Sequence, residues 1–153
     1  MATSATNGLL LVVSGPSGVG KTTMVHELIR RLGGEFSVSA TTRARTERER
    51  DGVDYHFVDQ AQFQRWIDDG RFLEFAQVFG RSWYGTLQDQ VEHALSEGKL
   101  IVLDIDVQGA RSVKARMPAA FTVFVLPPDE ETLLKRLLAR GRARARREDA
   151  VVE

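Results

Sequence analysis

Apolar positions along the chain follow two patterns that alternate. Continuous apolar runs, which are typical of parallel strands buried on both faces, occur at 9–13, 100–103 and 121–126. Apolar residues at helical spacing predict helices over 21–32, 61–69 and 88–97. We expect Gly33 and Gly98 to end the first and third of these helices. Strands that alternate with helices in this way indicate an α/β fold with a parallel core sheet.

The expected helices have identifiable core faces. Those of the second and third helix carry Phe63, Trp66, Ile67, Val91, Ala94 and Leu95. A fourth helix is expected from a cap at Asp129 to about Arg140, after Pro127 and Pro128 end the third strand. Its core face would hold Leu133, Leu134 and Leu137.

The stretch from 36 to 86 follows neither pattern. It mixes short β-type runs at 36–40, 55–58 and 73–78 with a charged loop at 43–54, and it lies between two expected core strands. We therefore predict an inserted subdomain facing a core made of 8–35 and 87–135. The whole chain, 1–153, is expected to form one domain, because its 153 residues suffice for a single core.

A phosphate-binding loop connects the first expected strand to the first expected helix. The run from Gly15 to Thr22 reads GPSGVGKT, which fits G-x-x-x-x-G-K-[ST] in the strand-to-helix context that this motif requires. Its glycines let consecutive backbone N–H groups point at an anion beside a helix N-terminus. Lys21 is then placed to reach β- and γ-phosphates, and the Thr22 hydroxyl to ligand Mg²⁺. The loop predicts nucleotide binding.

Composition narrows the class of protein. The chain has no cysteine, which fits a cytoplasmic protein without disulfides. Residues 1–8 are small and polar, so we expect neither a signal peptide nor a membrane anchor there. Net charge is zero, so no overall field draws the chain to nucleic acid or membrane, and the basic run after 135 fits phosphate chemistry or disorder better than nucleic-acid binding. The three histidines are isolated and predict no metal site.

Four further strings narrow the reading. They are FSVSATTR at 36–43, GVDYHFV at 52–58, WYGT at 83–86 and DIDVQG at 104–109. Together with the phosphate loop, and in this order, they resemble the guanylate kinase family over residues 8 to about 141. The resemblance implies a P-loop NTPase-type three-layer α/β fold with a parallel core sheet, a GMP-binding mixed-β insert and an Arg-rich lid at 136–147. It also implies Mg²⁺- and ATP-dependent phosphorylation of GMP to GDP.

The same resemblance implies a role for each matching residue. ATP would be bound by Gly15, Pro16, Ser17, Gly18, Val19, Gly20, Lys21, Thr22 and Thr23. GMP would be bound by Ser39, Arg43, Arg45, Tyr55, Glu74, Tyr84, Thr86, Asp104 and Asp106, with the base held by Glu74, Thr86 and Asp106. The metal ligands would be Thr22 and Asp104, and the catalytic residues Lys21, Arg43, Arg136 and Arg140. Carboxylates suit guanine, because they accept from its N1–H and 2-amino group, a donor edge that adenine lacks.

The chain departs from the family at three places. In the GMP loop, Arg45 stands for the family's proline, Thr46 for its second phosphate arginine and Arg48 for its glycine. The string 80–85 carries one residue more than the family's. After about 141 the pattern of a last lid arginine, helix and core strand is replaced by RARARR and the end of the chain, which a fragment, a frameshift or a truncated paralogue would each explain. On this basis we expect a poorly active, marginally stable chain.

Two other functions compete with an active GMP kinase. A non-catalytic guanylate-kinase-like binding module is one, although the intact Gly20-Lys21-Thr22 argues against it. A kinase of a phosphorylated sugar is the other, although Glu74 and Asp106 suit a guanine ring better.

Overall fold

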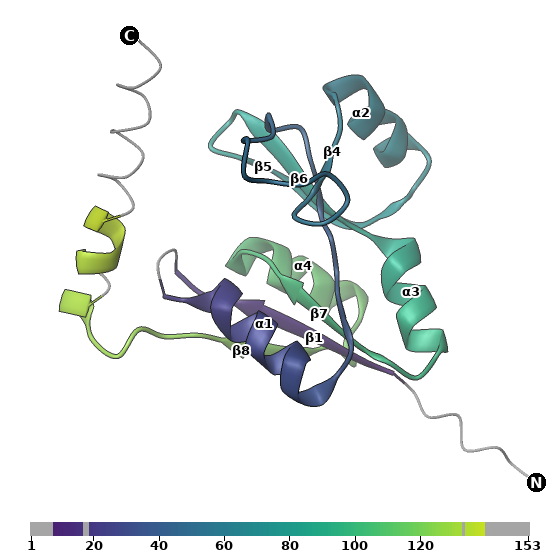
Figure 1. Ribbon diagram of the computed structural model, residues 1–153. Helices are drawn as coiled ribbons and strands as arrows, with labels where there is room; N and C mark the ends of the chain where they lie inside the picture. Colours follow the sequence, from purple (N-terminus) through teal and green to yellow (C-terminus); the bar gives the residue numbers. More distant parts are fainter. Residues whose placement is uncertain (1–7, 17–18, 133, 140–153) are drawn as a thin grey trace, which may run out of the picture.

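A parallel four-stranded sheet forms the centre of the molecule (Figure 1). The computed structural model describes residues 8–16, 19–132 and 134–139. The sheet has the order β2-β7-β1-β8, with β1 at Leu9–Ser14, β2 at Glu35–Phe36, β7 at Leu100–Asp104 and β8 at Phe121–Phe124. All three pairings are parallel. The α/β class and the parallel core sheet are thus confirmed.

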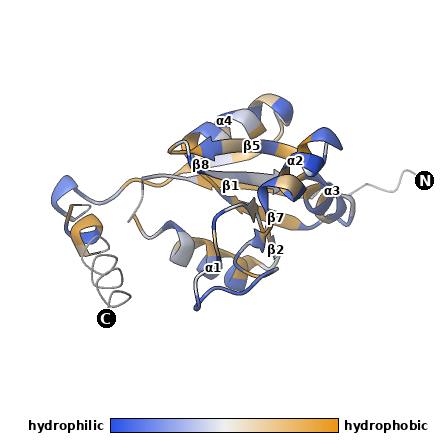
Figure 2. Cartoon of the chain, turned by 90° about the horizontal axis from the view of Figure 1, so that it is seen from above, coloured by the Kyte–Doolittle hydropathy of each residue, from blue (hydrophilic) through white to orange (hydrophobic). Residues whose placement is uncertain are grey.

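Helices cover both faces of this sheet, which gives three layers (Figure 2). Helix α1 (Lys21–Leu32) packs Val25, Leu28 and Ile29 against one face. Helices α3 (Gln88–Ser96) and α4 (Val107–Arg116) pack Val91, Ala94, Ala110 and Val113 against the other. Strands β1 and β7 are apolar at successive positions, because the side chains on both faces of the sheet contact helices.

The insert is a second, mixed sheet with its own small core. Its strands run in the order β4-β3-β6-β5, at β3 Ala40–Thr41, β4 His56–Phe57, β5 Phe72–Val78 and β6 Ser82–Leu87. Helix α2 (Gln60–Asp68), capped by the Asp59 carboxylate at the Gln62 N–H, packs Phe63 into this sheet. Phe63 stacks on Phe72 at 4.5 Å between ring centroids.

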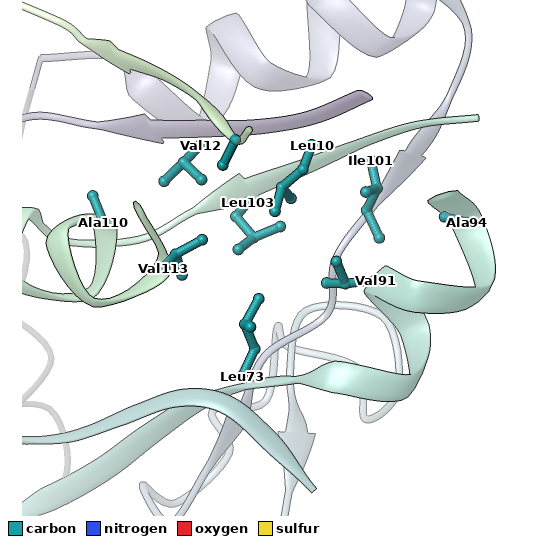
Figure 3. Close-up of a cluster of buried hydrophobic side chains, with 10 residues drawn as sticks. Leu10, Val12, Leu73, Val91, Ala94, Ile101, Leu103, Ala110 and Val113 are labelled. Atoms are coloured by element: carbon teal, nitrogen blue, oxygen red, sulfur yellow. The ribbon is translucent and has the colours of Figure 1, made fainter. Parts of the chain in front are cut away.

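The chain passes between the core and the insert twice, and side-chain packing and hydrogen bonds also join the two parts. Leu73 of β5 lies in the core cluster below Leu103 and beside Val113 and Val91 (Figure 3). At the first crossing the Ser37 N–H donates to the Val102 carbonyl, and the Gln90 side chain bonds Phe36 and Val38. These contacts fix the position of the insert relative to the core.

Three sequence-based expectations need correction, and one helix was not expected. Strand β8 is not buried on both faces, since Phe121 and Phe124 are 60% and 51% exposed on this edge strand. Phe36 pairs in the core sheet through β2, so the insert's own strands begin later. Leu134 and Leu137 are exposed rather than on a core face, although Asp129 does cap the turn at the Thr132 N–H, and Leu133 lies outside the described residues. Helix α4 was not expected at all. In addition, no helix among these residues is long and apolar enough to cross a membrane.

Candidate active site between the core and the insert

A cavity of about 550 Å³ lies between the phosphate loop and the insert sheet. This volume is in the range of small-molecule sites. From the core it is lined by Pro16, Gly20, Lys21, Thr22, His26, Phe36, Asp104, Ile105 and Asp106. From the insert it is lined by Ser39, Glu49, Val53, Asp54, Tyr55, Glu74, Ala76, Val78, Tyr84 and Gly85. Residues predicted to bind two different nucleotides therefore face one space.

The end of β1 and the start of α1 position the phosphate loop. Gly20 is the N-cap of α1 at φ 89°, a left-handed conformation that favours glycine, and no side chain in the described part of the chain caps the helix there. The first backbone N–H groups of α1 thus remain open to an anion. Gly15 allows a close approach, because a Cβ there would lie 2.5 Å from the Val125 carbonyl oxygen. Ser17 and Gly18 lie outside the described residues, while Val19 is buried and Thr23 is exposed on α1.

Asp104, at the carboxyl end of β7, joins the two polar residues that open α1. The Lys21 ammonium lies 3.0 Å from Asp104 Oδ1 and donates to the Ile105 carbonyl at 3.3 Å. The Thr22 hydroxyl donates to Asp104 Oδ2 at 3.0 Å. The carboxyl end of a parallel strand beside a helix N-terminus is where α/β sheets bind ligands. Charge and hydroxyl groups suited to phosphate thus converge at this edge.

The donor set fits Mg²⁺. The Thr22 hydroxyl and the Asp104 carboxylate are adjacent hard oxygen ligands that line the cavity. Within residues 8–16, 19–132 and 134–139 no group of three or more His, Cys, Asp or Glu side chains is arranged to hold a metal. Two protein oxygens are the usual share of a Mg²⁺ ion that also binds phosphates and waters.

Two tyrosines and an arginine meet on the insert side. Arg43 donates from Nε to the Tyr84 hydroxyl at 3.2 Å, and its guanidinium lies 5.3 Å from the Tyr55 ring centroid. The two tyrosine rings are 5.8 Å apart, edge to face. Burial raises the pKa of Tyr55, so its hydroxyl keeps its proton and can donate. This cluster is suited to a phosphate dianion.

Glu49 holds Arg43 in this arrangement. Both of its carboxylate oxygens accept from the Arg43 guanidinium, at 3.0 and 2.6 Å, and Oε2 also accepts from the Thr46 N–H. The guanidinium lowers the pKa of Glu49 to about 2. Sequence reasoning assigned no role to Glu49, although the family's loop motif ends in a glutamate at this position and was the available signal.

Glu74 and Asp106 converge from opposite sides of the cavity. Glu74, on β5, is buried and accepts from the Thr86 hydroxyl at 2.7 Å through Oε1. Asp106 caps α4 by accepting from the Gly109 N–H at 2.7 Å. A methyl group added to Gly109 would lie 3.2 Å from both Glu74 Oε2 and Asp106 Oδ1. Burial raises the pKa of Glu74, and the nearby Asp106 charge adds to the effect.

The remaining predicted residues are placed as follows. Ser39 lines the cavity. Arg45 is directed elsewhere, since it donates to the Glu49 carbonyl at 2.8 Å and is not among the lining residues. Arg136 donates to the Val19 carbonyl of the phosphate loop at 3.1 Å, which joins the expected lid to that loop. Arg140 lies outside the described residues.

Comparison with known proteins decides the family. The guanylate kinase family model matches residues 7–151. This chain belongs to the guanylate kinase family. It is 50% identical over 135 residues to a guanylate kinase of Alkalilimnicola ehrlichii and 54% identical over 138 residues to one of Anaeromyxobacter dehalogenans. A crystal structure of guanylate kinase from Anaplasma phagocytophilum superimposes with a TM-score of 0.74 at 35% identity, covering 90% of this chain and 70% of that one.

The chain spans only part of these relatives. The two alignments cover 88% of this chain but 66% and 59% of the curated bacterial proteins, and a match to guanylate kinase 1 of rice covers 35% of that protein. The family model and the superimposed structure establish the family and the fold of the part that this chain spans.

Proposed function

We propose that this chain transfers the γ-phosphoryl group of ATP to GMP, giving ADP and GDP. The observation that carries the proposal is the single cavity that Lys21 and Asp104 face from the core and that Tyr84 and Glu74 face from the insert. Two nucleotides with their phosphates directed at each other would share this space. Phosphoryl transfer asks for in-line placement and charge stabilisation, which the two halves of the cavity are suited to supply.

On the core side, the open N–H groups before Lys21 and the Lys21 ammonium would hold the ATP phosphates. Thr22 and Asp104 would hold Mg²⁺, which when bound offsets phosphate charge. Lys21 now contacts Asp104 and the Ile105 carbonyl, so it is already inside the cavity and has a short distance to reach a phosphate. Asp104 thereby serves both the lysine and the metal.

On the insert side, Ser39, Tyr55 and Tyr84 would donate to the GMP phosphate, with the Arg43 charge behind them. Arg45, as it lies, does not serve this subsite. Four of the five Arg43 N–H groups are engaged, by Tyr84, the Ala44 carbonyl and both Glu49 oxygens. Arg43 therefore contributes mainly through its charge and through the orientation of Tyr84.

Glu74 and Asp106 would read the base. Thr86 occupies Glu74 Oε1, which leaves Oε2 to accept from guanine, and Thr86 thus acts through Glu74. Adenine has an acceptor at N1 and no amino group at C2, so in this orientation it offers these carboxylates no donor, and binding it would leave buried charge without a partner. Arg136, and Arg140 by the family pattern, would stabilise the transferred group from the lid. The cytoplasmic location favoured by composition stays a prediction.

The test is a coupled assay of ADP formation with GMP, AMP and UMP as acceptors. We expect turnover with GMP that needs Mg²⁺ and falls by about 10²–10³ in Lys21→Met. Lys99→Met is the matched control, because Lys99 is an exposed lysine whose surface ion pairs contribute little. GMP binding without any turnover in the unmodified chain would instead indicate the non-catalytic module.

A further inference from the structure

Strand β5 contains a β-bulge at Leu73. Phe72 pairs with Leu87 and Glu74 pairs with Thr86, so Leu73 is the extra residue without a partner in the ladder. The three consecutive side chains enter three environments: Phe72 packs in the insert core and Glu74 lines the cavity. Leu73 packs in the main core (Figure 3). In a regular strand, neighbouring side chains would alternate between two faces. The bulge therefore aims Glu74 into the site.

A bulge also leaves a backbone carbonyl without its ladder partner. Arg116, in the last turn of α4, donates from Nη1 to the Leu73 carbonyl at 2.7 Å, with the Phe72 carbonyl at 3.4 Å. The bond joins the core helix to the residue that directly precedes Glu74. The Arg116 charge also favours the ionised form of the Glu74 carboxyl.

Both base-reading carboxylates depend on the same helix. Asp106 is the N-cap of α4, and Gly109 in its first turn leaves the space in which Glu74 Oε2 and Asp106 Oδ1 approach each other. At the other end of α4, Arg116 holds β5. Helix α4 thus determines the separation of two side chains, one on β5 of the insert and the other at its own N-cap.

We propose that Arg116 is a positioning residue for guanine selectivity: by holding the bulged Leu73 carbonyl, it fixes Glu74 beside Asp106. This inference rests on the proposed function, since it assigns guanine recognition to these two carboxylates. A purely structural arginine would affect both nucleotides and folding together. A positioning residue affects GMP alone, and only while Glu74 is present.

The experiment measures GMP, AMP and ATP binding by calorimetry for the full chain and for Arg116→Met. We expect GMP affinity to fall between about three- and tenfold, the range of one lost hydrogen bond, while ATP and AMP affinities change less than twofold. Arg111→Met is the control, because Arg111 is exposed on the same helix and makes no side-chain hydrogen bond among the described residues. Arg116→Lys keeps a shorter donor and should lose two- to threefold.

A double-mutant cycle with Glu74→Gln separates positioning from general destabilisation. In the Glu74→Gln background, Arg116→Met should cost no further GMP affinity. Additive losses, or equal losses of GMP and ATP, would overturn the inference. If Arg116→Met melts below the assay temperature, the cycle is run with Arg116→Lys and the same outcomes decide. If the wild-type chain binds GMP but never forms GDP, the proposed activity is refuted, and the binding data still decide the role of Arg116. If it binds no GMP, both proposals are refuted.

Discussion

The Nε–H of Arg43 donates to the phenolic oxygen of Tyr84 across 3.2 Å. A phenol that accepts a hydrogen bond still has its own O–H to donate. Because Tyr84 lines the cavity, this proton is available to an anion there, and a charged donor at the phenolic oxygen strengthens it. Arg43 thus acts on the proposed phosphate subsite through Tyr84 as well as through its own charge.

Tyr84→Phe tests this relay. The ring still packs edge to face on Tyr55, while the donor is lost. We expect KM for GMP to rise about tenfold, as for one lost hydrogen bond to a charged group, with KM for ATP unchanged. Steady-state kinetics with each substrate varied in turn measures both constants. A parallel rise in the two constants would show that Tyr84 supports the fold rather than GMP.

Glu49 makes the GMP loop sensitive to acid. Its pKa is lowered to about 2 by Arg43, so it contributes stability that is present above the ordinary glutamate pKa of 4.5 and is lost as the pH falls towards 2. Both side chains are partly exposed, so solvent screening limits the contribution to about 1 kcal/mol, or a few degrees in Tm.

The measurement is Tm at pH 7 and pH 3. Glu49→Gln should lower Tm at pH 7 and reduce the difference in Tm between pH 7 and pH 3. Glu47→Gln is the matched control in the same loop, because Glu47 is exposed and has no hydrogen bond or ion pair among the described residues. The same narrowing in both variants would mean that the Arg43 pair is not its cause.

Glu74 gives GMP binding a pH limit. Burial raises its pKa above 4.5, and only the ionised carboxylate accepts from both guanine donors. As the pH falls, GMP affinity should therefore begin to decline at a pH above the pKa of an ordinary glutamate. ATP affinity should stay level over the same range. Calorimetric titrations between pH 8 and pH 5 provide the profile. Glu74→Gln should bind GMP weakly and with a flat profile, and a decline that persists in this variant assigns the titration to another group.

Much of the core could be predicted because its signals are local. Helix α1 begins at Lys21 and ends at Leu32 as expected, since the phosphate loop and Gly33 are local signals of its ends. Strands β1 and β7 carry continuous apolar runs long enough to be recognised. Phe63, Val91 and Ala94 are buried as their spacing indicated.

Helix α4 was missed because its signal is weak. Only Gly109, Ala110 and Val113 are buried, and a glycine in the first turn obscures the period. The resemblance assigned Asp106 a base contact, and in the structure it is also the cap of this helix. Arg116 bonds a backbone carbonyl 43 positions away in the sequence, and Glu49 bonds a side chain within its own loop. Neither contact is encoded in a hydrophobic period.

Gly109→Ala separates helix stability from base recognition. Alanine is about 1 kcal/mol better than glycine inside a helix, which offsets crowding at the Asp106 cap, so Tm should change little. The new methyl group would meet Glu74 Oε2 and Asp106 Oδ1 at 3.2 Å each, so GMP affinity should fall at least several-fold. Ser112→Ala, at an exposed position of the same helix, is the control for propensity. Tight GMP binding in Gly109→Ala would place the guanine ring away from these two oxygens.

Gln90 should stabilise the connection between core and insert. Its side chain donates to the Phe36 carbonyl at 3.1 Å and accepts from the Val38 N–H at 3.2 Å, so it pairs with the first crossing as a neighbouring strand would. Gln90 lies on α3, directly after the second connection between insert and core, and therefore joins the two connections.

Gln90→Leu should speed amide hydrogen exchange at 36–41 and lower kcat/KM several-fold, because Ser39 and Arg43 follow this segment into the site. Gln88→Leu is the matched control, since among the described residues the Gln88 side chain bonds only Glu92 of its own helix. If exchange at 36–41 is equally slow in wild type and Gln90→Leu, the hydrogen bond from Ser37 to Val102, rather than Gln90, holds this connection.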